Sequence, residues 1–254
     1  DNIKPSIKGL AIYPLENSVV NNADTAIHLK VVSQDNKYHI ENPEFKVNGN
    51  IAFGINVYDQ ADGSPNKNGA HSIELYADDK LIFKIVSDKY SYGETRYINS
   101  MIDYSHYIRN NERFIRTEID KFNKLNNLYK TTNGVVNVNE YDTIKMKYVV
   151  KDYNNNKSVL NFTLVGSGSV DLEEKPILPR SFYRIYDGEA GNINLDGFEV
   201  DIPQTAFYDD VAIKAERIDT ITDTYSFFAY RLGTEEIPLH KKINIRLKRK
   251  SEYM

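Results

Sequence analysis

Hydrophobic and polar residues alternate along much of the first two thirds of the chain. Residues 73–86 alternate on both sides of Asp78-Asp79, and this pattern predicts two antiparallel strands joined by a tight turn. Residues 146–165 repeat the pattern around a polar loop, and residues 51–58 predict one further strand. Because a period of two residues is typical of strands with one buried face, we expect this part of the chain to form β-sheets.

One segment departs from this alternation. The apolar side chains of residues 94–108 fall on one helical face, and they are Ile98, Met101, Ile102 and Ile108. This spacing predicts a short helix. Residues 109–135 are polar and weakly patterned, so we interpret them as a long insertion that packs over the strands.

A glycine-serine stretch at residues 166–169 predicts a linker and therefore a domain boundary. Five short segments after it are predicted to be strands, namely residues 182–186, 198–202, 211–215, 225–231 and 242–247. Short strands with frequent turns favour sandwiches over a parallel α/β sheet. We therefore predict an all-β fold of two immunoglobulin-like β-sandwich domains. The first spans residues 1–168 and carries the helix and insertion at about 94–135, and the second spans residues 169–254.

Composition narrows the classes of function. Hydrophobic residues make up 41% of the 254 residues, which is enough for packed cores. The formal net charge is −4, and this argues against a nucleic-acid partner because such domains are usually basic. The apolar runs are too short to cross a bilayer, so we expect no membrane span. Since cysteine is absent, disulfides, thiolate metal ligands and a cysteine nucleophile are excluded.

The sequence offers no recognisable catalytic motif. The chain has five histidines, which are His28, His39, His71, His106 and His240. None of them forms the H-x-H or H-E-x-x-H spacing of a zinc site, and no glycine-rich phosphate loop occurs. We therefore predict no catalytic residue and no cofactor-binding residue, and we expect that this chain is not an enzyme.

One loop offers several hard oxygen ligands of the kind that Ca²⁺ prefers. Asp59, Asp62 and Asn68 lie in or next to the loop after the strand at 51–58. In an immunoglobulin-like topology the turn at Asp152 would lie at the same end of the sandwich. These four residues are candidates for a structural calcium site, and the alternative is an ordinary turn rich in Asp and Asn.

The helix and insertion also supply candidates for a partner surface. Tyrosine and arginine are enriched at interaction surfaces. On that ground Arg96, Tyr104, Tyr107, Arg109 and Phe114 are the candidate contact residues. The alternative is that the aromatic residues seal the open side of the sandwich.

Several segments together resemble one known family. They are residues 4–15 (KPSIKGLAIYPL), 49–104, 148–166 (YVVKDYNNNKSVLNFTLVG), 200–213 (VDIPQTAFYDDVAI) and 238–248 (PLHKKINIRLK). Residues 4–15 resemble the exit from the catalytic domain of Gram-negative lysostaphin-like murein zinc metallopeptidases. The remaining segments resemble the immunoglobulin-like and β-sandwich accessory region that follows that domain.

The resemblance implies an accessory region without its catalytic domain. The zinc ligands of the family lie upstream of this region, so no catalytic residue carries over, although a parent protein would be a zinc murein endopeptidase. We therefore expect a non-catalytic region that positions or docks a cell-envelope peptidoglycan metallopeptidase-like protein. Two alternatives stay open, namely a stand-alone envelope binding or assembly protein and a carbohydrate-binding module.

The resemblance also indicates partners and a location. The expected partner is an envelope protein or the parent peptidase domain, and peptidoglycan is a further candidate. The expected location is the periplasm, the outer membrane or the cell surface of a Gram-negative bacterium.

Overall fold

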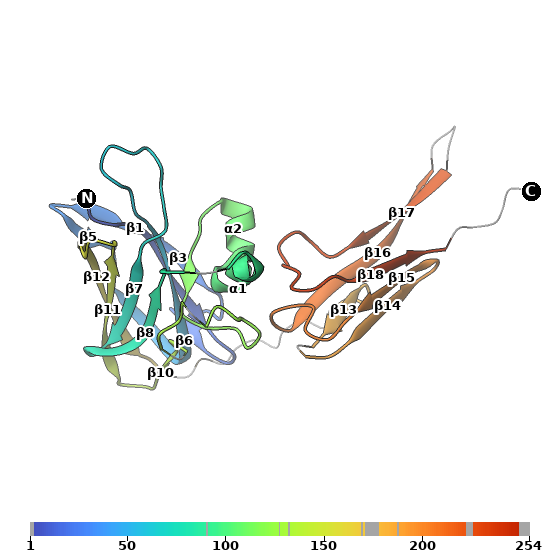
Figure 1. Ribbon diagram of the computed structural model, residues 1–254. Coiled ribbons are helices and arrows are strands. Elements are labelled where there is room, and N and C mark those ends of the chain that lie inside the picture. Colours follow the sequence, from blue (N-terminus) through green and yellow to red (C-terminus); the bar gives the residue numbers. More distant parts are fainter. Residues whose placement is uncertain are drawn as a thin grey trace, which may run out of the picture. The chain divides into compact units, whose positions relative to one another are not determined.

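In the computed structural model the chain divides into two compact units (Figure 1). It describes residues 3–89, 91–126, 128–131, 133–168, 170, 178–186, 188–221 and 226–248. The first unit comprises Asp1–Ile119 and Asn123–Glu173, and the second comprises Asp120–Phe122 and Glu174–Met254. Both units are built from β-strands, as the alternation predicts. Among the described residues no helix is long and apolar enough to cross a membrane.

The first unit is a ten-stranded sheet with the main order β3-β1-β6-β12-β11-β7-β8. These strands are β1 (Ser6–Pro14), β3 (Ile27–Lys30), β6 (Glu44–Tyr58), β7 (Ser72–Ala77), β8 (Lys80–Val86), β11 (Thr143–Lys151) and β12 (Lys157–Gly166). Three short strands pair with β6 outside this path, namely β2 (Val19–Val20), β9 (Ile115–Arg116) and β10 (Val136–Val138). A separate small hairpin joins β4 (Val32–Gln34) to β5 (Lys37–His39).

The sheet of this unit forms two layers, one that contains β1 and one that contains β12, and strand β6 belongs to both. Its second half pairs with β1, whereas its first residues pair in parallel with the end of β12. Between the two halves, Gly49 has φ +91°, and a Cβ there would lie 2.4 Å from Ser18 Oγ. The core lies between the layers, where the ring of Phe162 on β12 is 5.7 Å from that of Phe53 on β6. A 15-residue strand can therefore serve both layers because a glycine accommodates the change of partner.

The two predicted hairpins of the first unit are confirmed. Strands β7 and β8 are joined by Asp78 and Asp79, whose φ values are 46° and 64°. Positive φ at both central residues is the geometry that matches the twist of a two-residue hairpin. Strands β11 and β12 pair without a break from Thr143 to Lys151, so the second polar loop also closes a hairpin.

The predicted helix is present but is divided into three pieces. They are the 3-10 helix η1 (Tyr92–Tyr97) and the α-helices α1 (Ile98–Met101) and α2 (Tyr104–Asn110). The division occurs because Ile102 is extended, with φ −110° and ψ 161°, and Asp103 then caps a new helix. The backbone after α2 returns to the sheet as β9 and closes one side of the core. There the fully buried Thr117 hydroxyl accepts from Phe53 N at 3.0 Å and donates to Gly134 O at 2.8 Å.

The first half of the predicted glycine-serine linker is part of the sheet, which corrects the expectation at these residues. Gly166 ends β12, and a Cβ there would lie 1.8 Å from Asn139 O. Ser167 N donates to Val47 O at 2.9 Å, and Ser167 O accepts from Asn48 Nδ2 at 2.7 Å. Small side chains are thus required here for close packing. Of the other two linker residues, Gly168 is described and Ser169 lies outside the described residues.

The second unit contains two three-stranded sheets with a shared core. One has the order β13 (Phe182–Ile185), β16 (Val211–Ile221) and β17 (Ser226–Leu232), and the other has the order β14 (Gly191–Leu195), β15 (Phe198–Ile202) and β18 (Asn244–Leu247). Ile193 and Val200 from one sheet and Ile213 and Ala215 from the other are buried in one cluster. Strand β14 was not expected from the sequence. It pairs with β15 across Asp196-Gly197, where Gly197 has φ +79°.

Candidate functional site

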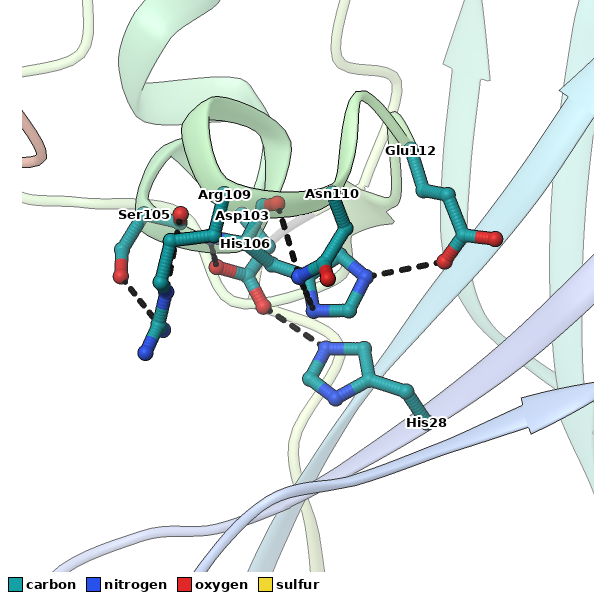
Figure 2. Close-up of polar contacts among 7 residues, drawn as sticks. All are labelled: His28, Asp103, Ser105, His106, Arg109, Asn110 and Glu112. Atoms are coloured by element: carbon teal, nitrogen blue, oxygen red, sulfur yellow. Dashed lines mark hydrogen bonds and ion pairs between the residues drawn. The ribbon is translucent and has the colours of Figure 1, made fainter.

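A cluster of ionisable side chains lies where the helical insertion meets strand β3 (Figure 2). Among the residues that the structure describes, one set of three or more His, Asp or Glu side chains has all its ligand atoms within 4.8 Å of one another. This set is His28 on β3, Asp103 at the start of α2 and His106 in its first turn. Glu112 contacts the set from the loop that follows α2.

Local structure explains how each member is positioned. His28 is held by the pairing of β3 with β1, in which it lies opposite Ala11. Asp103 is the N-cap of α2, and its Oδ1 accepts from His106 N at 3.0 Å. An N-cap carboxylate and the residue three positions later lie at the same end of a helix, so the sequence D-x-x-H brings Asp103 and His106 together.

Asp103 is a stable negative charge at the centre of the cluster. Burial by itself raises the pKa of this carboxyl group, but hydrogen bonds from His28 and from the His106 amide lower it to about 2. The distance between Asp103 Oδ2 and His28 Nε2 is 2.9 Å. Burial and the charge of Asp103 also raise the pKa of Tyr13 well above its usual value, so that neighbour stays a neutral phenol.

The two histidine rings are stacked, with centroids 3.8 Å apart and planes inclined by 14°. The ring of Phe114 meets both rings edge-on, at centroid distances of 5.0 and 5.2 Å. His106 Nε2 lies 3.0 Å from Glu112 Oε2, so each imidazole has its own carboxylate partner. Their side chains are 22% and 12% exposed, which leaves part of each ring in contact with solvent.

A second feature of the first unit is a groove of about 1080 Å³. Five of its lining residues are lysines, namely Lys4, Lys37, Lys145, Lys147 and Lys157. Asp78 and Asp79 lie at the same groove, and Lys147 Nζ is 2.6 Å from Asp79 Oδ1. The lysines outnumber the carboxylates, so the groove favours anionic ligands.

The four calcium candidates are only partly brought together. Asp59 and Asn68 exchange two backbone hydrogen bonds of 2.8 Å. Burial and the nearby charge of Asp152 raise the pKa of Asp59, so these two carboxylates influence each other. Asp152 itself is buried and accepts from Asn156 N at 2.8 Å and from Asn156 Nδ2 at 2.7 Å. Asp62 is exposed in the loop and does not join Asp59 and Asp152 in a converging set of carboxylates.

The candidate partner residues differ in exposure. Arg96 and Arg109 are exposed, and Tyr104 and Tyr107 are half-buried. Arg109 bonds to Ser105 on its own helix, with a distance of 2.8 Å to Ser105 Oγ. Phe114 is only 2% exposed and packs in a cluster with Ala11, Tyr13 and Ala52. Phe114 therefore belongs to the core, which corrects its assignment to a partner surface.

The histidine cluster was not found from the sequence. His28 and His106 are separated by almost eighty residues, so no local motif connects them. The sequence feature that could have pointed to it is Asp103-x-x-His106, at the break in the helical pattern. That signal becomes informative only once β3 is known to lie beside α2.

Comparison with known proteins gives one partial match. A family model described as a Zu5-like domain matches residues 185–253, which lie in the second unit. The second unit is therefore similar to Zu5-like domains, and the match covers less than a third of the chain. No curated protein and no solved structure matches the chain.

Proposed function

We propose that this chain is a non-catalytic accessory or binding region that positions or docks a peptidoglycan metallopeptidase-like protein in a Gram-negative cell envelope. The observation that carries the proposal is the part of the insertion that belongs to the first unit, where α2 and the loop after it carry exposed arginines and half-buried tyrosines. The sequence resemblance of residues 4–15 and 49–104 supports the choice of parent protein.

The contact residues lie on α2 and in the loop after it. We define the docking face as Tyr104, Tyr107, Arg109 and Arg113. The guanidinium of Arg113 lies 5.1 Å from the ring centroid of Tyr107, and Arg109 is exposed on the same helix. The two arginines outnumber the one acidic neighbour, Glu112, so the face is positively charged on balance and favours an acidic surface on the parent peptidase domain.

The lysine-lined groove supports peptidoglycan as a further ligand. Peptidoglycan stem peptides carry carboxylates, and the groove presents five lysines against two aspartates. Such a site concentrates an anionic polymer by long-range attraction and holds it through charge-assisted hydrogen bonds. Binding to sacculi should therefore weaken as the salt concentration rises.

A binding experiment tests the docking face. The purified chain is mixed with the lysostaphin-like catalytic domain of its parent protein, and Arg109→Glu with Arg113→Glu is expected to reduce binding at least tenfold. Lys80→Glu, an exposed charge reversal at the start of β8, serves as the control and should bind as the parent chain does. Equal binding by all three proteins would remove the docking face from the proposal.

The absence of hydrolysis is tested separately. The chain is incubated with purified peptidoglycan and Zn²⁺, and soluble muropeptides are measured. We expect no release above that of peptidoglycan alone. Release that a chelator abolishes would contradict the assignment as a non-catalytic region.

A further inference from the structure

We propose that His28, Asp103 and His106 form a binding site for a divalent transition-metal ion of the Zn²⁺ class. Two imidazoles and one carboxylate are a ligand set that Zn²⁺ uses with a fourth position left to water. Imidazole nitrogen favours Zn²⁺, Cu²⁺ and Ni²⁺, whereas Ca²⁺ and Mg²⁺ prefer oxygen ligands.

The separations between the ligand atoms fit such an ion. Ligands at about 2.0–2.1 Å in a tetrahedral site lie about 3.3 Å from one another. Here His28 Nε2 and Asp103 Oδ2 are 2.9 Å apart, and all three ligand atoms lie within 4.8 Å of one another. The ligand atoms are therefore close enough to share one ion once the side chains, which retain partial exposure, rotate toward it.

The groups behind the ligands also match a metal site. A histidine that binds a metal commonly donates its other ring N–H to a carboxylate, which orients the ring and makes it a stronger ligand. His106 fits this arrangement when its Nε2 carries the proton, since Nε2 lies 3.0 Å from Glu112 Oε2. Its Nδ1, on the other side of the ring, lies 3.3 Å from Asn110 Nδ2, and an ion at Nδ1 would replace that contact (Figure 2). Asp103 is held in turn by the His106 amide, so the backbone of α2 fixes the carboxylate.

The stacked rings predict how the ion enters. Two nearly parallel rings 3.8 Å apart cannot both point their nitrogens at one ion, so one ring must tilt out of the stack. Metal binding therefore replaces the His28–Asp103 hydrogen bond with two bonds to the ion and separates the rings. The histidine ring protons should report this change, because each ring now lies in the shielding zone of the other.

The bound ion would join the insertion to the sheet. His28 belongs to β3, whereas Asp103 and His106 belong to α2, and α2 carries the docking face. A metal bond across this boundary would hold α2 against β3 and stabilise the first unit by mass action. The site stands on its own ligands, so it does not depend on the docking function proposed above.

Zn²⁺ and Co²⁺ alone are the probes. Zn²⁺ affinity is measured on the whole chain by competition with a chromophoric chelator, and Co²⁺ coordination by visible absorption. The chain is expected to bind one equivalent, with the d–d bands of a four-coordinate Co²⁺ site and shifted ring-proton resonances for two histidines.

Three variants and one control locate the site. His28→Gln and Asp103→Asn should weaken Zn²⁺ binding at least tenfold and abolish the Co²⁺ bands. Asparagine is as good an N-cap as aspartate, so Asp103→Asn keeps the helix end and separates metal loss from unfolding. Glu112→Gln should weaken binding by about tenfold through the orientation of His106.

The control is a histidine with a similar setting elsewhere. His71 Nδ1 lies 3.7 Å from Asp88 Oδ1, and its ring meets Tyr153 edge-on at 5.3 Å. His71→Gln should bind Zn²⁺ as the parent chain does. Failure of the parent chain to bind one equivalent, or equal binding by a folded Asp103→Asn variant, would overturn the proposal. Neither result bears on the docking experiments, which are performed without added metal.

Discussion

At the scale of single residues, Glu74 on β7 is a buried carboxylate outside the histidine cluster. Its side chain is 4% exposed and bonds to Lys84 at 2.8 Å, to Lys151 at 3.0 Å and to the hydroxyl of Tyr76 at 2.9 Å. Burial alone raises the pKa of Glu74, but these three partners outweigh it and hold the pKa below its usual value. A buried carboxylate with three donors stabilises the hairpin only while it is ionised.

Glu74→Gln should therefore lower the free energy of unfolding by about 1–3 kcal/mol at pH 7, measured by urea denaturation. A carboxylate whose pKa is lower in the folded state contributes its stability above the pKa of the unfolded chain, which is about 4.3. This contribution is lost as the pH falls through the lower folded-state pKa. The difference between the parent chain and the variant should thus shrink below about pH 4. Glu41→Gln, which changes an exposed carboxylate, is the control. A difference in the free energy of unfolding between the parent chain and Glu74→Gln that stays constant with pH would contradict the argument.

At the scale of elements, the end of β12 shows why a glycine-serine sequence does not always predict a linker. Gly166 is paired with Val47, and Ser167 continues the contact with β6 through one backbone hydrogen bond to Val47 O and one from the Asn48 side chain. At Gly168, two residues later, an added Cβ would lie 3.6 Å from its nearest neighbour, Glu140 Oε1, so a methyl group fits there. The two glycines are alike in sequence context and differ in the space around them.

Gly166→Ala should destabilise the first unit by about 1–3 kcal/mol or more, since the added methyl group collides with the carbonyl oxygen of Asn139. Gly168→Ala is the matched control and should change stability by less than about 0.5 kcal/mol. Urea denaturation followed by tyrosine fluorescence measures both. Equal effects at the two positions would show that the close contact at Gly166 is relieved by a backbone shift.

At the scale of the whole molecule, each unit has a hydrophobic core of its own. The second unit buries Ile193 and Val200 from one sheet against Ile213 from the other. Two cores of this kind predict two cooperative unfolding transitions rather than one.

Val200→Ala should therefore move only one of the two transitions in a urea titration, because Val200 is fully buried in the second core. Gly166→Ala should move only the other transition. The expected loss for the valine is about 1–3 kcal/mol. A single transition that shifts with both substitutions would mean that the two units unfold together.

The strands were predictable because their signal is local. Alternation over five to eight residues identified both hairpins of the first unit, and Asp78-Asp79 marked a turn that needs two positive φ values. The same reasoning missed the division of the helix at Ile102, since an apolar residue continues the helical pattern whether its backbone is helical or extended. It also placed Phe114 on a surface, because an aromatic residue between arginines has the composition of an interface.

The sequence by itself determined the all-β class, the hairpins and the lack of a zinc motif, because each depends on residues close together in the chain. Only the tertiary structure brought His28 to Asp103 and His106, since that contact depends on β3 pairing with β1 and on α2 packing beside it. It also decided that Gly166 is packed in the sheet and that Phe114 is buried. Contacts between distant segments depend on how the other strands pack around them. A pattern of neighbouring residues in the sequence does not predict that packing.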